Sequence, residues 1–321
     1  MSDPVSDQSP GSIWERGVLE KLATAALQEQ KRARKWGIFF KTLGFIYLFA
    51  LLFVALGWIG KKEGALPGKH TALVELEGVI AADGEASADK MTSGLQEAFK
   101  DKRTQGVILR INSPGGSPVQ AGYINDEIRR LRAKYPTIPL YAVVEDVCAS
   151  GGYYVAVAAD KIFVDKASIV GSIGVLMDGF GFSGSLEKLG VERRLLTAGS
   201  DKGFLDPFSP LVPAQKDYAE KMLSEIHGQF IDVVKQGRGK RLKDNPELFS
   251  GLVWTGQRSV ELGLADALGN VDYVAREIIK ADHIVDFTPH ENLAERFAKR
   301  LGAGAAEAFL RFSGASGVAV R

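Results

Sequence analysis

An uncharged apolar run near the amino terminus constrains this chain more than any other feature. From Leu43 to Gly60 the sequence reads LGFIYLFALLFVALGWIG, 18 residues without a charge, and extending it back to Trp36 gives 25 residues with one lysine. A helix of that length crosses roughly 30 Å of hydrocarbon. Trp36 and Trp58 lie near its two ends, where indole side chains prefer the membrane interface. We therefore expect one transmembrane helix over residues 36–60.

Basic residues are distributed unequally around this run. They are Lys31, Arg32, Arg34, Lys35 and Lys41 on the amino side, and Lys61, Lys62 and Lys69 on the carboxyl side. Because cytoplasmic flanks are richer in Lys and Arg, we expect residues 1–35 in the cytoplasm and the residues after about 61 outside it. A buried core helix and a cleaved signal peptide are the alternatives. About 35 residues precede the run, far more than a usual n-region, which favours an uncleaved anchor.

Composition excludes several functional classes. The 321 residues are 45% hydrophobic and 25% charged, as is typical of globular proteins. Forty Lys and Arg against 39 Asp and Glu give a net charge of +1, which does not favour nucleic acid as a partner. Cys148 is the only cysteine, so neither an intrachain disulfide nor a multi-thiolate metal site can form. We expect no metal and no cofactor.

Strand-like and helix-like segments alternate after residue 70. The strand-like runs are residues 71–80, 106–112, 138–146 and 161–165. Between the second and third runs, Ile124, Ile128 and Leu131 recur at helical spacing. This alternation predicts an α/β domain with a largely parallel sheet. A long helix follows, and we expect its apolar stripe to pack in the core: Leu211, Tyr218, Met222, Ile226, Phe230 and Val233.

Two glycine-bearing turns follow predicted strands. EDVCASGGYYVAVAADK places Ser150 before Gly151, and INSPGGSP places Gly115 and Gly116 after the preceding strand. Open α/β sheets bind ligands at this carboxyl edge. The amides of Gly151 and of Gly115 or Gly116 can form an oxyanion hole, because glycine lets a substrate carbonyl approach the backbone closely. Taken alone, Ser-Gly-Gly is nevertheless more typical of a simple turn than of a nucleophile.

Local motifs do not identify a base that would activate Ser150. The four histidines, at positions 70, 227, 283 and 290, lie outside the glycine-rich turns, and the G-x-S-x-G motif is absent. A Ser-His-Asp triad is thus an unsupported alternative. A lysine is the remaining choice, provided that desolvation lowers its pKa. Spacing does not choose among the candidates: Lys161, Lys166, Lys188 and Lys202.

Several motifs, taken in order, resemble one protein family. VILRINSPGGSPVQA, ASGGYYVAVAADKIFVDKASIVGSIGV, GSDKGFLDPFSP and WTGQRSVELGLADALGNVD look like segments of signal peptide peptidase A, also called protease IV. This is a family of membrane-anchored serine proteases with a Ser/Lys dyad, and the resemblance covers about residues 70–275. It implies that Ser150 is the nucleophile and that Lys202 is the general base. Ser172, in VGSIGV, matches a serine segment of the family and would hydrogen-bond the lysine, although a turn role explains it equally well.

The resemblance also implies a fold and an assembly. The fold would be the spiral of βαβ units found in the Clp protease and the crotonases. One SPGG and one SGGYY make this chain similar to the short, single-domain members. Those members resemble rings, so the resemblance implies a homo-oligomer, an octamer, in which Ser150 of one subunit meets Lys202 of its neighbour. The expected parts are a cytoplasmic segment 1–35, an anchor 36–60, a linker 61–70, a protease domain 71–281 and an extension 282–321.

The activity implied by the resemblance is that of an endopeptidase on the non-cytoplasmic side of the membrane. Its substrates would be remnant signal peptides and other unfolded apolar peptides. A related periplasmic protease of envelope proteins, a crotonase-fold acyl-CoA enzyme and a non-catalytic membrane scaffold are the alternatives. The anchor argues against the acyl-CoA enzyme, because it directs the domain away from the cytosol. An intact Ser150 and Lys202 argue against the scaffold.

Overall fold

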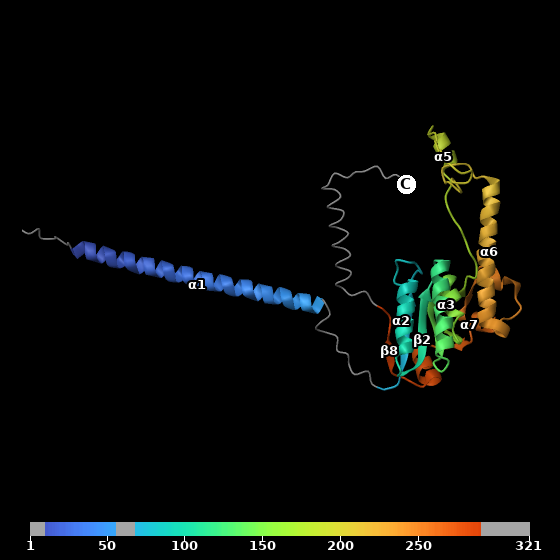
Figure 1. The fold of residues 1–321 in the computed structure, drawn as a ribbon, viewed down its shortest axis with the longest axis horizontal. Helices are drawn as coiled ribbons and strands as arrows, with labels where there is room; N and C mark the ends of the chain where they lie inside the picture. Colours follow the sequence, from blue (N-terminus) through green and yellow to red (C-terminus); the bar gives the residue numbers. More distant parts are fainter. Residues whose placement is uncertain (1–9, 56–67, 290–321) are drawn as a thin grey trace, which may run out of the picture. The chain divides into compact units, whose positions relative to one another are not determined.

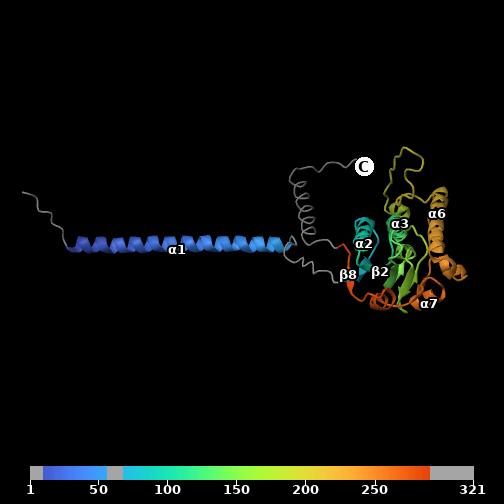
Figure 2. The ribbon, with the colours of Figure 1, turned by 60° about the horizontal axis from the view of Figure 1, so that its bottom comes forward.

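A computed structural model describes residues 10–55 and 68–289, which belong to two compact units. The described part of the first unit is a single helix, α1 (Pro10–Ala55), of 46 residues (Figures 1 and 2). Within the described ranges, α1 is the one helix long and apolar enough to cross a membrane, and its apolar window is not buried against other residues. Trp58 and most of the linker expected at 61–70 lie outside the described residues.

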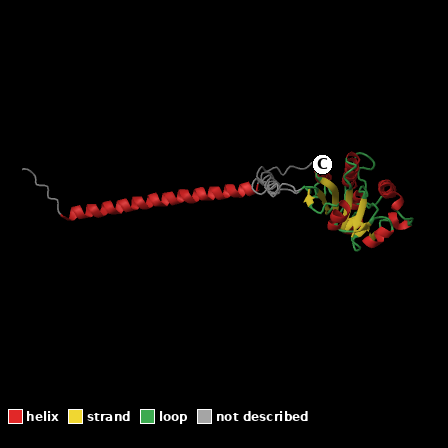
Figure 3. Ribbon diagram, turned by 90° about the horizontal axis from the view of Figure 1, so that it is seen from below, coloured by secondary structure: helices red, strands yellow, loops and turns green. Residues whose placement is uncertain are grey.

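The second unit is built on an eight-stranded sheet, drawn in yellow in Figure 3. Its strands are β1 (His70–Glu77), β2 (Thr104–Ser113), β3 (Leu140–Ala149), β4 (Lys161–Val164), β5 (Ile169–Gly171), β6 (Val253–Thr255), β7 (Ala267–Leu268) and β8 (Ile284–Asp286). The main path runs β6-β5-β3-β2-β1-β8, while β4 pairs with β3 and β7. Every pair is parallel except β5 with β6. The sheet thus continues past residue 281, the expected end of the domain, and residues 290–321 lie outside the described part of the chain.

Helices connect these strands and confirm the predicted α/β class with βαβ units. They are α2 (Ala88–Lys100), α3 (Pro118–Lys134), α4 (Gly151–Ala156), α5 (Ser183–Lys188), α6 (Pro213–Arg238), α7 (Gly256–Glu261) and α8 (Val271–Tyr273). Short 3₁₀ turns at Gly239–Arg241 and Pro246–Phe249 and a π-helical turn at Val274–Ile279 complete the unit. Helix α3 begins where the sequence favours it, because the Ser117 side chain caps the amide of Gln120 and Pro118 is its first residue.

Strand β3 changes its partner along its length. Its first part pairs with β4, in the register Tyr141↔Lys161, and its last residues pair with β5, in the register Ala149↔Gly171. On its other side β3 pairs with β2 as far as Ser113↔Cys148. The carboxyl ends of β2, β3 and β5 therefore lie next to one another, and the turns that follow β2 and β3 meet at one edge of the sheet.

Both faces of the sheet are buried along its centre. On one face, Val74 and Leu109 pack with Ile128 of α3 in the larger core cluster. On the other face, Leu73 and Val143 belong to a second cluster that includes residues of the π-helical turn. Neighbouring strand residues point to opposite faces, so a run such as LVEL fits a strand that is covered on both sides.

The apolar stripe of α6 packs in the core only in part. Phe230 and Val234 are buried, but Tyr218 is 64% exposed and Leu211, just before the helix, is 62% exposed. The prediction that the whole stripe is core is therefore wrong for its amino-terminal part. Helical periodicity identifies an apolar face, but it does not say what covers that face.

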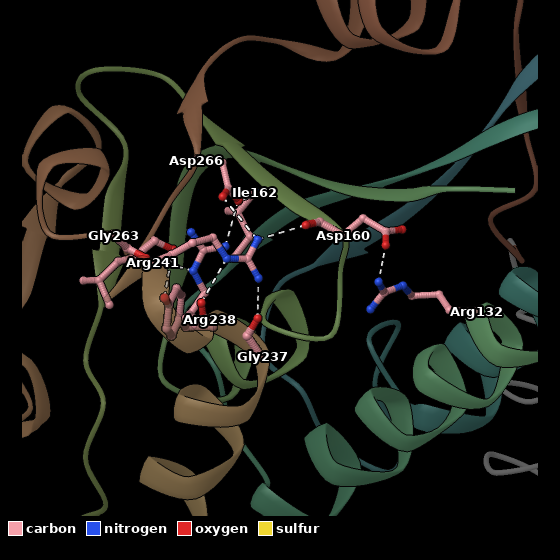
Figure 4. A network of polar contacts seen from close by, with 10 residues as sticks. Arg132, Asp160, Ile162, Gly237, Arg238, Arg241, Gly263 and Asp266 are labelled. Carbon is pink, nitrogen blue, oxygen red and sulfur yellow. Dashed lines mark hydrogen bonds and ion pairs between the residues drawn. The ribbon is translucent and has the colours of Figure 1, made fainter. Parts of the chain in front are cut away.

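A buried ion pair fixes the carboxyl end of α6 (Figure 4). Arg238 is 1% exposed, and its Nη1 donates to Asp266 Oδ2 at 2.7 Å while its Nε donates to the Gly263 carbonyl at 2.8 Å. Asp266 also accepts from the amide of Ile162 in β4 at 2.7 Å and from Arg241 at 3.2 Å. These bonds tie α6 to the sheet at the end of the helix opposite to α5.

Replacing Asp266 by Asn should destabilise the protein. Burial raises the pKa of Asp266, but the hydrogen bond and charge of Arg238 outweigh that effect and hold the pKa below its ordinary value. A depressed pKa in the folded state contributes stability that is present above about pH 4 and is lost as the pH falls through the folded value. Asp266→Asn leaves Arg238 buried without a counter-charge, so we expect a loss of about 3 kcal/mol at pH 7 and a weaker acid dependence.

Thermal unfolding of the full chain in detergent between pH 7 and pH 3 measures both effects. Glu261→Gln is the matched control, because it removes an exposed ion pair with Arg258 and should change stability by less than about 1 kcal/mol. Equal Tm values for Asp266→Asn and the wild type at pH 7 would show that the pair does not hold α6.

Candidate active site

Ser150 occupies a strained turn between β3 and α4. Its φ of 51° and ψ of −121° lie outside the regions that residues other than glycine favour. The Ser150 amide donates to the carbonyl of Gly171 in β5 at 2.9 Å, and its carbonyl accepts from the Tyr154 amide at 2.9 Å. Bonds to a strand on one side and a helix on the other therefore hold the serine in this conformation.

The two glycine turns expected from the sequence lie against each other. A methyl group on Gly115 would lie 2.6 Å from the amide nitrogen of Gly151 and 2.8 Å from Cβ of Ser150. One on Gly116, which has a φ of 146°, would overlap the carbonyl oxygen of Ile80. Neither position has room for a side chain, and their lack of one keeps the backbone beside Ser150 accessible.

The backbone amides in these turns differ in whether they already donate a hydrogen bond. The Gly115 amide donates to Ser113 Oγ at 3.1 Å. Gly151 is the first residue of α4, so its amide has no acceptor inside the helix. Within residues 68–289, the amides of Gly116 and Gly151 have no hydrogen-bond acceptor. Of the glycines that the sequence singled out, Gly116 and Gly151 are therefore the ones free to bind an oxyanion.

A cavity of about 540 Å³ opens beside Ser150. Gly116, Gly151 and Ser172 line it together with the serine. Ser172 directly follows β5 and also has a positive φ, 52°. Most other lining residues are apolar, among them Pro118, Ala121, Val175, Leu176, Ile226 and Phe230. The cavity can thus take an apolar side chain next to the Ser150 hydroxyl.

Lys202 does not line this cavity. It is exposed in the segment between α5 and α6, and Figure 1 shows α5 beyond the amino-terminal end of α6. The other lysines considered from the sequence, Lys161, Lys166 and Lys188, are also exposed and do not line the cavity. Within residues 10–55 and 68–289 the structure therefore brings together the serine and the glycines, but no lysine joins them.

Other reactive side chains near the cavity do not compete with Ser150. Burial raises the pKa of the Cys148 thiol, which is therefore a neutral core side chain. His227, on α6, lies beside the cavity wall with Nε2 3.1 Å from the Ile173 carbonyl. No histidine lines the cavity in the described part of the chain. Among the same residues, no group of three or more His, Cys, Asp or Glu side chains could hold a metal ion.

Comparison with known proteins gives the class and the family. Residues 132–284 match peptidase family S49. A putative signal peptide peptidase SppA of Enterococcus faecium is 31% identical over 235 residues, which cover 71% of this chain and 67% of that protein. A putative protease of Synechocystis is 31% identical over 201 residues, covering 63% and 70% of the two chains. These matches place the chain in a class of peptidases. It belongs to peptidase family S49, and the resemblance found in its motifs is confirmed.

A further match involves part of a longer protein. The Na⁺/H⁺ antiporter NhaA of Brucella melitensis is 47% identical over 204 residues, which cover 62% of this chain and 28% of that protein. The chain thus spans less than a third of the length of this relative. The antiporter activity in the name of that protein is not assigned to this chain.

Gly115→Ala should impair catalysis without unfolding the protein. The added methyl would fill the space beside the Gly151 amide, at a φ of 99° that L residues avoid. We expect kcat on an apolar peptide to fall about 10²- to 10³-fold, as when one oxyanion donor is lost, with the circular dichroism spectrum retained. Gly122→Ala on α3 is the control, because a methyl there meets nothing within 4 Å. Wild-type kcat in Gly115→Ala would exclude an oxyanion hole at this turn.

Proposed function

We propose that this chain is a serine endopeptidase in which Ser150 is the nucleophile and Lys202 the general base. The observation that carries the proposal is the strained Ser150 beside two free backbone amides at an apolar cavity. A serine in an ordinary turn has no need of a positive φ, and such strain concentrates at functional sites. Membership of peptidase family S49 supports the same reading.

The chemistry follows from these groups. Neutral Lys202 takes the proton from Ser150 Oγ as the oxygen attacks the peptide carbonyl carbon, and the amides of Gly116 and Gly151 bind the resulting oxyanion. When the intermediate collapses, the C–N bond breaks and the leaving amine takes the proton from Lys202. Water then attacks the acyl carbon and loses a proton to Lys202. The bond between the acyl carbon and Ser150 Oγ breaks, and Lys202 returns the proton to Oγ. Ser172, which lines the same cavity, would support the lysine by a hydrogen bond.

We infer that Lys202 reaches the cavity from a neighbouring subunit. The segment that carries it, residues 174–212, is called the arm below. Several of its large apolar side chains are exposed: Leu176 at 79%, Phe180 at 78%, Leu189 at 75% and Leu196 at 95%. Apolar surface of this extent marks an interaction site. A second copy of the chain would cover the apolar surface of the arm. Lys202 of one copy would then lie next to Ser150 of the other. The number of eight subunits comes from the family resemblance.

The cavity supports peptide substrates with an apolar residue at the cleavage site. Its lining is largely apolar, and an extended peptide can pair with strand-edge backbone next to the site. We propose remnant signal peptides and other unfolded apolar peptides as substrates. The alternative within the class is that this chain is a related periplasmic protease that degrades other envelope proteins.

We propose that α1 anchors the protein in the inner membrane with its amino terminus in the cytoplasm. The length and apolar composition of the helix support the anchor, and the basic residues on its amino side support the orientation. The catalytic unit would then meet signal peptides on the periplasmic side.

Mixing two inactive variants tests the shared site. Ser150→Ala and Lys202→Met should each abolish peptidase activity of the full chain in detergent. When the two are unfolded, mixed in equal amounts and reassembled, about a quarter of the junctions pair an intact Ser150 with an intact Lys202, and activity should return to about that fraction. Full activity in either single variant would refute the dyad. Two inactive variants that stay inactive after mixing would place both residues in one subunit.

Cysteine labelling tests the orientation. In intact spheroplasts, a membrane-impermeant maleimide should label Lys161→Cys, which is exposed in the catalytic unit. Glu20→Cys, exposed on the amino-terminal part of α1, should be labelled only after permeabilisation. The unmodified chain is the blank, because Cys148 is buried. The reverse pattern would place the catalytic unit in the cytoplasm.

A further inference from the structure

The lysine proposed as the base has a carboxylate next to it in the chain. Lys202 follows Asp201 in a compact turn, residues 199–206, which we call the lysine loop. Its backbone is held by bonds from the Lys202 amide to Gly199 O at 3.2 Å and from the Phe204 amide to Asp201 O at 3.0 Å. A general base must be neutral to act, and an opposite charge within about 4–6 Å favours the charged ammonium. The loop therefore places a chemically unfavourable group beside the base.

Both oxygens of this carboxylate are nevertheless occupied by other donors. Gln215, in the first turn of α6, donates from Nε2 to Asp201 Oδ1 at 3.1 Å, and Ser200 Oγ donates to Asp201 Oδ2 at 2.9 Å. Hydrogen bonds from Gln215 and then Ser200 hold the pKa of Asp201 below its ordinary value, so the carboxylate stays charged where it is held. Among the described residues, no ion pair within 4.0 Å joins Lys202 to a carboxylate.

The carbonyl oxygen of the Gln215 side chain also binds the lysine loop. This oxygen, Oε1, accepts from the amide of Leu205 at 3.3 Å, and Leu205 has a positive φ of 53°. One side chain thus contacts the loop on both sides of Lys202, at positions 201 and 205. Because Gln215 belongs to α6, it fixes the lysine loop to the helix whose far end is held by the Arg238–Asp266 ion pair.

Resting on the proposed role of Lys202, we propose that Gln215 is a positioning residue that holds the Asp201 carboxylate away from the Lys202 amine. Without Gln215, Asp201 keeps only the bond from Ser200 and can turn to pair with Lys202, which favours the protonated amine.

Among the other charged groups near the lysine loop, Asp206 and Lys216 are already engaged, whereas Asp217 on α6 has no ion pair among the described residues. Asp206 is bound by Ser209 at 2.6 Å and by Arg193, which comes from the segment before the loop, at 3.4 Å. Lys216, next to Gln215 on α6, pairs with Glu220 at 3.4 Å. Asp201 is therefore the carboxylate whose release would reach Lys202 most directly.

The pH dependence of kcat/KM for the full chain tests this role. In the wild type, kcat/KM should rise with pH, because a general base acts in its neutral form. Gln215→Leu leaves the net charge unchanged but removes one of the two donors that hold Asp201, so the acid limb should move upward by about 0.5 to 1 pH unit. Activity below the limb should fall about three- to tenfold, and activity on the plateau above it should be unchanged. A merely structural loss would lower kcat/KM at every pH.

A second substitution separates the carboxylate from loop closure. In Asp201→Asn/Gln215→Leu the acid limb should return to its wild-type position, because no carboxylate remains to pair with Lys202. Gln236→Leu, on the exposed part of the same helix, is the matched control and should leave the profile unchanged. An unmoved limb in Gln215→Leu, or a shift that persists in the double variant, would overturn the proposal. Full activity in Lys202→Met would instead refute the proposed dyad. That result is distinct from an unmoved acid limb in Gln215→Leu, which refutes only the role of Gln215.

Discussion

The structure of the site depends on the unfavourable backbone conformation of one serine. Ser150 keeps a φ of 51° because β5 accepts its amide and α4 donates to its carbonyl. Glycines at 115 and 116 complete the arrangement, since a methyl on Gly115 would touch both Ser150 and the Gly151 amide. The strand-to-helix turn, the change of partner along β3 and the meeting of two glycine turns all position one hydroxyl beside free amides.

Within the described residues of one chain, the proposed Ser/Lys dyad is not assembled. A serine and two free backbone amides line the cavity and no described lysine does, whereas the arm carries Lys202 and a set of exposed apolar side chains. Helix α6 connects these two regions. Its carboxyl end is fixed by Arg238 and Asp266, Phe230 packs in the core, and its amino end holds the lysine loop through Gln215. This division supports the proposal that activity depends on assembly.

The features of this site that depend on a few neighbouring residues could be predicted from the sequence. Strand-like runs and glycine turns predicted the α/β class and placed Ser150 and Gly151 at a sheet edge, because strand periodicity and turn chemistry act over a few residues. Lys202 came from family resemblance, since it lies far along the chain and outside the cavity. Tyr218 was assigned to the core because periodicity does not distinguish a core from an interface. Gln215 gave no signal, because its role is visible only once the lysine loop has folded against α6.

The central claim, that Ser150 is a nucleophile activated by Lys202, is tested most directly by locating a fluorophosphonate adduct. Mass spectrometry of the treated full chain should find one adduct, on Ser150 Oγ, because phosphonylation requires an activated hydroxyl beside an oxyanion site. The same treatment of a folded Lys202→Met chain should leave Ser150 unmodified. An adduct on a different residue, or equally fast labelling of Ser150 without Lys202, would contradict the account.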